Sequence, residues 1–447
     1  GINTTEVVDA LVEAQRAPQQ QSIDRLKTKA DVQISAYGLI KSSLDTLRSA
    51  FDTLNDVSDL KKFDVSSSNS AILDGTASAN AIAGDYAIAV NTLAERTVWN
   101  TNIIAAATSA SPINGGAAFS FDIDQNGTVT TITVTTDTPA GIQKAVNKAR
   151  IGLTAGLIDT GNGFVVSLAG DYGRDNDFIV QNIQNNAAMA ASRQSTAVNA
   201  DLTVNGVTVS RAANTVSDAV PGVTMTLKAV TAAQTLTVTQ DPSTLETALR
   251  NLVAVYNETE VLFDELSNGA NPDDSLVGSL RSDSSFRGIR SAIRSVLTNP
   301  SSTPSGDINY LSDIGVQFER DGSLSINESR FSEALSSQFT DIVQALTAGT
   351  DNQSIFSTEN AGLAGDMSVL IFSYTRTTGS VSTTILARTE DLQKYEDDLE
   401  DLSRRMAIVK DRYVSQFSAM QAIVDEMNST RDYLKQQLES LPFSSKD

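Results

Sequence analysis

The stretch that decides the fold lies near the end of the chain, at residues 392–427, LQKYEDDLEDLSRRMAIVKDRYVSQFSAMQAIVDEM. Every seventh residue around it is apolar or aromatic: Ile385, Leu392, Leu399, Met406, Tyr413, Met420, Met427, Leu434 and Leu441. This repeat predicts a long helix with an apolar seam that packs against another helix. The predicted helix is about 85 Å long at 1.5 Å per residue. Its methionines and its polar intermediate positions favour a weak, adaptable seam.

A second heptad seam lies near the start of the chain, over residues 23–54. Its side chains step by three and four, and only Gln33 interrupts them: Ile23, Leu26, Ala30, Tyr37, Ile40, Leu44, Leu47, Phe51 and Leu54. The predicted seam is about 48 Å long. Pro18 predicts a break in front of it, with a short separate helix upstream.

The two seams suit one another as partners. Basic residues such as Lys27 flank the first seam and acidic residues such as Glu396 flank the second, which weakly favours pairing. We expect an antiparallel coiled coil with these interface residues: Ile23, Leu26, Tyr37, Ile40, Leu44, Leu47, Phe51, Leu392, Leu399, Met406, Tyr413, Met420, Met427, Leu434 and Leu441. Residues 23–54 cover only part of the longer helix. The segment from Met420 to Leu441 is therefore expected to dock on another protein.

Between the two seams the heptad pattern gives way to short segments in which apolar and polar residues alternate. Short alternating segments predict strands, with hairpin turns at Asn126-Gly127 and Asn205-Gly206, and Thr138 is expected to cap a short helix that starts at Pro139. The predicted fold class is multi-domain α+β, in which the antiparallel coiled coil carries inserted β-rich and α+β head domains. The expected domains are 1–62 (N-terminal leg), 63–100 with 200–241 (β-rich head), 101–199 (inserted α+β head), 242–372 (helical, with a β-hairpin) and 373–447 (C-terminal leg).

The composition of the 447 residues excludes several kinds of chemistry. With no cysteine and no histidine, the chain has no disulfides, no thiolate zinc site and no Ser-His-Asp triad. A net charge of −21 argues against nucleic-acid binding. No apolar run is long enough to predict a membrane span, and the start does not look like an ordinary secretory signal. We expect no enzyme activity, no cofactor and no metal.

One stretch invites a different interpretation. Asp122, Asp124, Asn126 and Gly127 match the first positions of a calcium-binding loop, but Thr133 stands where that loop needs a glutamate. The hairpin explains the same residues without a metal. A glycosidase would need two convergent buried carboxyl groups, and the sequence offers no such pair.

Several stretches together resemble a known family. The most specific is LTVNGVTVSRAANTVSDAVPGVTMTL (202–227), joined by LVEAQRAPQQQSIDRLKTKADVQISAYGLIKSSLDTL (11–47) and YVSQFSAMQAIVDEMNSTRDYLKQQL (413–438). In this order they resemble the bacterial flagellar filament-capping proteins, the flagellar hook-associated protein 2 family. The resemblance covers nearly the whole chain and is weakest over 101–198.

The resemblance implies a structural role. Members of that family form a ring-like homo-oligomer at the distal filament tip, expected here to be a pentamer, although a hexamer is also open. The ring promotes insertion and folding of exported flagellin and prevents its loss. Flagellin, the hook-associated junction proteins and a cytosolic export chaperone are the implied partners. The implied location is extracellular, reached by the flagellar type III route, and the 101–199 domain could contact host surfaces.

Two other structural proteins fit parts of the pattern. A surface adhesin or fibre protein would have a coiled-coil stalk below a β-rich head, but its stalk is expected to be a parallel trimer. Flagellin or a hook–filament junction protein shares the design with helices at both ends. The hairpin motif at 204–207, VNGV, favours the cap.

Overall fold

Both ends of the chain fold into one unit, and the middle folds into another. The computed structural model describes residues 4–184, 186, 189–268 and 275–440, and it separates into unit 1 (Gly1–Asp56 with Glu246–Asp447) and unit 2 (Val57–Leu245). The mixture of helix and sheet confirms the predicted α and β content. Each unit is described by itself.

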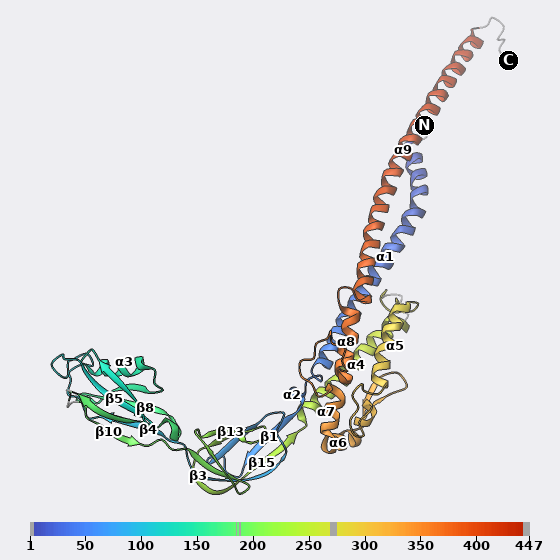
Figure 1. The fold of residues 1–447 in the computed structure, drawn as a ribbon. Coiled ribbons are helices and arrows are strands. Elements are labelled where there is room, and N and C mark those ends of the chain that lie inside the picture. Colours follow the sequence, from blue (N-terminus) through green and yellow to red (C-terminus); the bar gives the residue numbers. More distant parts are fainter. Residues whose placement is uncertain (1–3, 185, 187–188, 269–274, 441–447) are drawn as a thin grey trace. The chain divides into compact units, whose positions relative to one another are not determined.

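Unit 1 is mainly helical (Figure 1). Its helices are α1 (Thr4–Asp52), α4 (Ser243–Asn268, which begins at the boundary), α5 (Ser284–Thr298), α6 (Glu328–Ser337), α7 (Phe339–Thr347), α8 (Gly362–Thr375) and α9 (Ser380–Glu439), with a short 3-10 turn, η3 (Leu311–Ile314). Strands β16 (Val316–Phe318) and β17 (Leu324–Ile326) form an antiparallel hairpin. Asn327 caps α6 by accepting a hydrogen bond from the Arg330 amide.

The expected break at Pro18 is wrong. α1 runs without interruption from Thr4 to Asp52, with Pro18 inside it. A proline in a helix interior typically costs about 3 kcal/mol, because it removes one backbone hydrogen bond and crowds the preceding turn. Here α1 contacts α9 on both sides of the proline, through Gln15 and Lys27. The residues expected to form a short upstream helix are therefore the first part of α1.

The second half of α1 is part of a helical core. Tyr37, Ile40, Leu44, Leu47 and Phe51 are all at most 1% exposed. Polar contacts also join α1 to its neighbours: the Ser43 hydroxyl donates to Thr259 of α4, and the Ser368 hydroxyl of α8 donates to Asp52. This half of the predicted seam is therefore shared between α9 and the helical body.

A buried ionic cluster joins α4 to α5. The side chain of Glu260 is 7% exposed and accepts hydrogen bonds from Arg290 Nη2 at 2.6 Å and Arg294 Nη2 at 2.7 Å. The Tyr256 hydroxyl lies 3.2 Å from Glu260 Oε1 and 3.1 Å from the Gly322 carbonyl, next to the β16–β17 turn. Burial, followed by the charge of Glu260, raises the pKa of Tyr256 above its ordinary value of 10.0. One carboxylate thus holds two helices and a hairpin together.

We predict that Glu260→Ala destabilises the helical body by about 3 kcal/mol, because Arg294 loses its carboxylate and Arg290 keeps only the exposed Asp264, 2.6 Å from its Nη2. Urea unfolding followed by circular dichroism measures the effect. The matched control is Glu328→Ala, which removes an exposed carboxylate from Arg250. We expect that control to unfold like the parent chain. Equal losses in the two variants would contradict the role given to Glu260.

Unit 2 begins with a short helix, α2 (Val57–Leu60), and is otherwise mainly sheet (Figure 1). One sheet has the order β1-β15-β3-β11-β12 and another has the order β13-β14-β2. Their bounds are β1 (Lys62–Ser67), β2 (Leu73–Ala77), β3 (Gly84–Thr92), β11 (Ala200–Val204), β12 (Val207–Arg211), β13 (Thr215–Val220), β14 (Val223–Leu227) and β15 (Thr231–Asp241). They share one core, which includes Leu202, Met225 and Leu236.

A second core in unit 2 has its buried residues between Ile104 and Met189. It is formed by two sheets, with the orders β10-β4-β8-β7 and β6-β5-β9, together with helix α3 (Pro139–Ala149). Their bounds are β4 (Arg96–Thr101), β5 (Phe119–Gln125), β6 (Thr128–Val134), β7 (Thr154–Asp159), β8 (Phe164–Tyr172), β9 (Ile179–Gln184) and β10 (Ala191–Ser195), with a 3-10 turn, η1 (Arg174–Asn176). The boundaries of the five domains expected from the sequence stay predictions.

Both Asn-Gly hairpins are confirmed. Asn126 and Gly127 have φ angles of 52° and 88°, and Asn205 and Gly206 have 50° and 83°, so these residues take the left-handed region that such two-residue turns require. Val204 pairs with Val207 across the second turn, as predicted. Thr138 caps α3 by accepting a hydrogen bond from the Gly141 amide, with Pro139 at the first helical position.

Candidate partner-binding surface

The terminal helices α1 and α9 lie side by side and run in opposite directions (Figure 1). Lys410 Nζ lies 2.8 Å from Asp9 Oδ1, the Gln15 amide donates to the Tyr413 hydroxyl at 3.0 Å, and Lys27 Nζ lies 2.9 Å from Glu396 Oε1. Residues near the start of α1 contact α9 around residues 410–413, and Lys27, later in α1, contacts the earlier Glu396. The two helices therefore pair antiparallel within one chain.

The two interhelical ion pairs raise the pKa of their lysines. The hydrogen bond to Glu396 raises the pKa of Lys27 above 10.5, and the hydrogen bond to Asp9 does the same for Lys410. A raised lysine pKa means that the stabilising effect is present at neutral pH and is lost as pH rises through the raised value. All four side chains are substantially exposed, so salt and water screen these pairs. They select the register more than they add stability.

The heptad seam on α9 is buried or half-buried between Leu392 and Tyr413. Leu402 and Met406 are buried at 1% and 9% exposure. Leu392, Leu399 and Tyr413 are half-buried. Beyond Tyr413 the heptad pattern of burial ends. Gln416, three residues further and at the next seam position, is exposed, whereas its neighbour Phe417 is half-buried.

The seam on the first half of α1 differs from the prediction. Ile23 is half-buried, but Leu26 is 45% exposed, and Lys27 is the residue that reaches α9. Val8 is fully buried, and Arg16 is half-buried with its Nε lacking a hydrogen-bond partner. Apolar spacing does not identify Arg16, because a long basic side chain can cover a helix with its methylene stem. The ion pair of Lys27 with Glu396 joins two of the flanking charges that favour pairing in the sequence.

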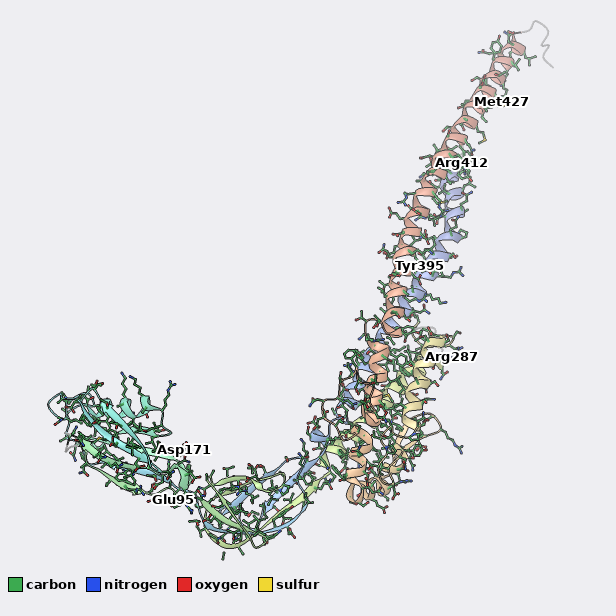
Figure 2. All side chains as sticks on the ribbon, in the orientation of Figure 1. Glu95, Asp171, Arg287, Tyr395, Arg412 and Met427 are labelled. Atoms are coloured by element: carbon green, nitrogen blue, oxygen red, sulfur yellow. The ribbon has the colours of Figure 1, made fainter. Side chains whose placement is uncertain are left out.

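The far end of α9 extends beyond this pairing. Every described residue from Ser418 to Ser440 is exposed, and Figure 2 shows Met427 near this end, further along than Arg412. Five apolar side chains form a surface that we name the distal stripe: Met420 (51% exposed), Ile423 (58%), Met427 (68%), Leu434 (54%) and Leu438 (63%). They recur at spacings of three, four, seven and four residues, which places them along one side of the helix. Leu441, also expected at this interface, lies outside the described residues.

An unpaired apolar stripe of this size is unusual for the surface of a monomer. A run of exposed apolar side chains at helical spacing is typical of a helix that lies in a groove or beside a helix of another protein. That the predicted seam residues contact such a partner stays a prediction. The structure shows where the distal stripe begins. Burial on α9 ends at Phe417, and the described residues of α1 do not cover the helix beyond it.

The calcium-loop interpretation of Asp122 and Asp124 is not supported by the geometry of these carboxylates. Asp124 accepts a hydrogen bond from the Gly127 amide, and Asp122 accepts from Thr131 and Asn182, which lowers the pKa of Asp122. These carboxylates therefore stabilise the hairpin. Among the described residues, no group of three or more acidic side chains is arranged to hold a metal ion. Within the same residues, no helix combines the length and apolarity needed to cross a bilayer.

A long helix pair with an exposed apolar end, joined in sequence to β-rich regions, is typical of an assembly protein. Models of the N-terminal and C-terminal regions of flagellar hook-associated protein 2 match residues 1–97 and 197–429. The chain belongs to the flagellar hook-associated protein 2 family.

Individual relatives agree with this assignment. The flagellar hook-associated protein 2 of Escherichia coli K12 is 30% identical over 98% of this chain and 97% of its own length. The B-type protein of Pseudomonas aeruginosa PAO1 is 26% identical over 99% of this chain and 96% of its own. The crystal structure of the D1, D2 and D3 domains of the flagellar cap protein FliD from Escherichia coli is similar with a TM-score of 0.63 and 28% identity. It covers 79% of this chain and 99% of that one.

The antiparallel pairing predicts a cross-link within one chain. The protein has no cysteine, so Lys27→Cys with Glu396→Cys supplies the only thiols. A bismaleimide with a spacer of about 10 Å, roughly one helix diameter, should join them into a product of monomer mass. Mass spectrometry at low protein concentration measures the yield.

The matched control pairs Lys27→Cys with Met427→Cys. Position 427 lies about 46 Å beyond 396 along the helix, so an intrachain product should not form. A parallel stalk between chains would instead give dimers of the first variant. Dimers as the main product would overturn the pairing.

Proposed function

We propose that this chain is a structural capping protein at the distal tip of the bacterial flagellar filament, where it promotes insertion and folding of exported flagellin and prevents its loss. Membership of the hook-associated protein 2 family and the similarity to the Escherichia coli cap protein support capping over a surface adhesin. The structural observation that carries the proposal is the distal stripe, an uncovered apolar surface at the end of a helix pair.

In this proposal α1 and α9 form an antiparallel coiled coil that acts as a leg. The distal stripe is the part of the leg that touches the last flagellin subunits. Full burial of one such side chain contributes about 1.5–3 kcal/mol, but ordering flexible methionines and leucines against a partner offsets part of this. Five side chains on one helix therefore give a contact that binds and also releases. A cap that moves as subunits are added needs this combination.

The finer features of the cap belong to the same proposal. The chain forms a ring-like homo-oligomer, with a pentamer as the expected form, and unit 2 supplies head domains. Further partners are the hook-associated junction proteins and a cytosolic export chaperone. The protein acts outside the cell after export by the flagellar type III route. A chain without cysteine suits a route that passes unfolded polypeptides, because no disulfide has to be opened. No step needs catalysis or a cofactor.

A charge placed on the distal stripe should block capping. In a strain that lacks its own cap protein, we predict that the double variant Met427→Lys, Leu434→Lys releases at least tenfold more flagellin into the medium than the parent chain. Two ammonium groups would have to lose water on docking, which is costly without an anionic partner. Filament length by electron microscopy and secreted flagellin by immunoblot measure the result.

Ile408→Lys serves as the control. Ile408 is also on α9 and is 70% exposed, but it lies within the paired segment and outside the distal stripe. That variant should support filaments of normal length. Circular dichroism should show unchanged helix content for both variants. Normal filament growth with the double variant would contradict docking through the stripe.

A further inference from the structure

The methionines divide sharply by exposure. The chain has six of them. Met189, Met225 and Met367 are 0% exposed, and Met406 is 9% exposed, while Met420 and Met427 are 51% and 68% exposed. Both exposed methionines belong to the distal stripe. They stand one heptad apart, about 10.5 Å along the helix axis.

Exposure controls the chemistry that is open to a thioether. A water-exposed methionine is readily oxidised to its sulfoxide, whereas a buried one is protected by its neighbours. The chain has no cysteine, so no thiol competes for the oxidant. The most accessible sulfur atoms of the folded protein are therefore those of Met420 and Met427.

We infer that Met420 and Met427 are modification sites for two-electron oxidants of the peroxide class, and that their sulfoxides weaken docking of the distal stripe. The second half of this inference rests on the function proposed above. In the reaction the O–O bond of hydrogen peroxide breaks, one oxygen atom forms an S=O bond, the sulfur is oxidised by two electrons, and water leaves. No other reagent or cofactor takes part.

The position of these side chains separates an effect on docking from an effect on folding. Both lie in a helical segment whose described residues are all exposed, so a polar sulfoxide there disturbs no core. A docked stripe, by contrast, would have to bury the sulfoxide oxygen in an apolar contact. Oxidation is thus expected to leave the fold intact while it removes apolar contact from the stripe. Methionine sulfoxide reductases reverse the modification.

The chemical part is tested on the folded full-length chain with dilute hydrogen peroxide. Trypsin cleavage after Arg412 and Arg431 gives one peptide, residues 413–431, that contains both methionines. Mass spectrometry should show Met420 and Met427 oxidised at least tenfold faster than Met189, Met225 and Met367. Similar rates at all sites would overturn the inference. The same experiment in urea, where every site is open, controls for intrinsic reactivity.

The docking part is tested with the same preparations on filaments of the matching flagellin. Binding to filament ends should weaken by about tenfold or more after oxidation, as expected from the loss of one or two apolar contacts, and should recover after treatment with MsrA and MsrB. In the variant Met420→Leu, Met427→Leu, peroxide should not change binding from its starting value, whatever that value is. Equal binding by the oxidised and untreated parent chain would overturn the docking part.

The control without peroxide separates a failure of the proposed capping function from a failure of the inference about methionine oxidation. If the untreated chain does not bind filament ends, the proposed function fails, and the docking part of the inference fails with it. If the untreated chain binds and the oxidised chain binds equally, only the inference fails. If peroxide weakens the parent and the leucine variant alike, damage elsewhere explains the loss and the assignment to these two methionines is wrong.

Discussion

The antiparallel register of the two terminal helices, set where Lys27 lies opposite Glu396, is the constraint on which the rest of the structure depends. α9 has 60 residues and α1 has 49. Part of α1 is also used in the helical body, where Tyr37, Leu44 and Phe51 are among its buried residues and Ser43 contacts α4. With Lys27 opposite Glu396, α1 covers α9 only to about Phe417. The remaining segment, 418–439, is about 33 Å of helix with one apolar side. The register of a few side chains thus determines which part of α9 the described residues of α1 cover.

The protein combines a rigid region with a weakly held one. In the helical body, Glu260 is nearly fully buried and is shared by two arginines, and aromatic rings such as Phe263 and Phe286 meet edge to face at 5.2 Å. Between the long helices, the ion pairs are exposed and the seam contains glutamine, arginine and methionine. Tight packing in the body fixes where α1 and α9 leave it. Weaker pairing beyond it suits a leg that binds and releases repeatedly.

Sequence patterns predicted the features that depend on neighbouring residues. The hairpins at Asn126-Gly127 and Asn205-Gly206 follow from the need for positive φ angles, and the cap at Thr138 follows from its own side chain. The heptad positions on α9 between Leu392 and Tyr413 follow from helical periodicity. Family membership followed from longer stretches of sequence.

Features that depend on distant residues were missed. A heptad repeat does not say which element covers each residue, so the share of α1 that packs in the helical body was not foreseen. Pro18 by itself predicts a break, yet α1 continues through it and contacts α9 on both sides. Leu26 is expected at the interface because it is apolar, but it is 45% exposed. In the Glu260 cluster the two arginines lie 30 and 34 positions beyond the glutamate, and no local pattern signals it.

The central claim is that the end of α9 is uncovered in the free protein and covered when the cap is in place. Hydrogen exchange of the amides in residues 418–440 tests this most directly, in the free full-length chain and in the chain bound to filament tips. An uncovered single helix opens readily, so these amides should exchange much faster than those near Leu402 in the free chain. On the filament, their exchange should slow by at least tenfold. Equal exchange of this segment in the free and bound states would contradict the account.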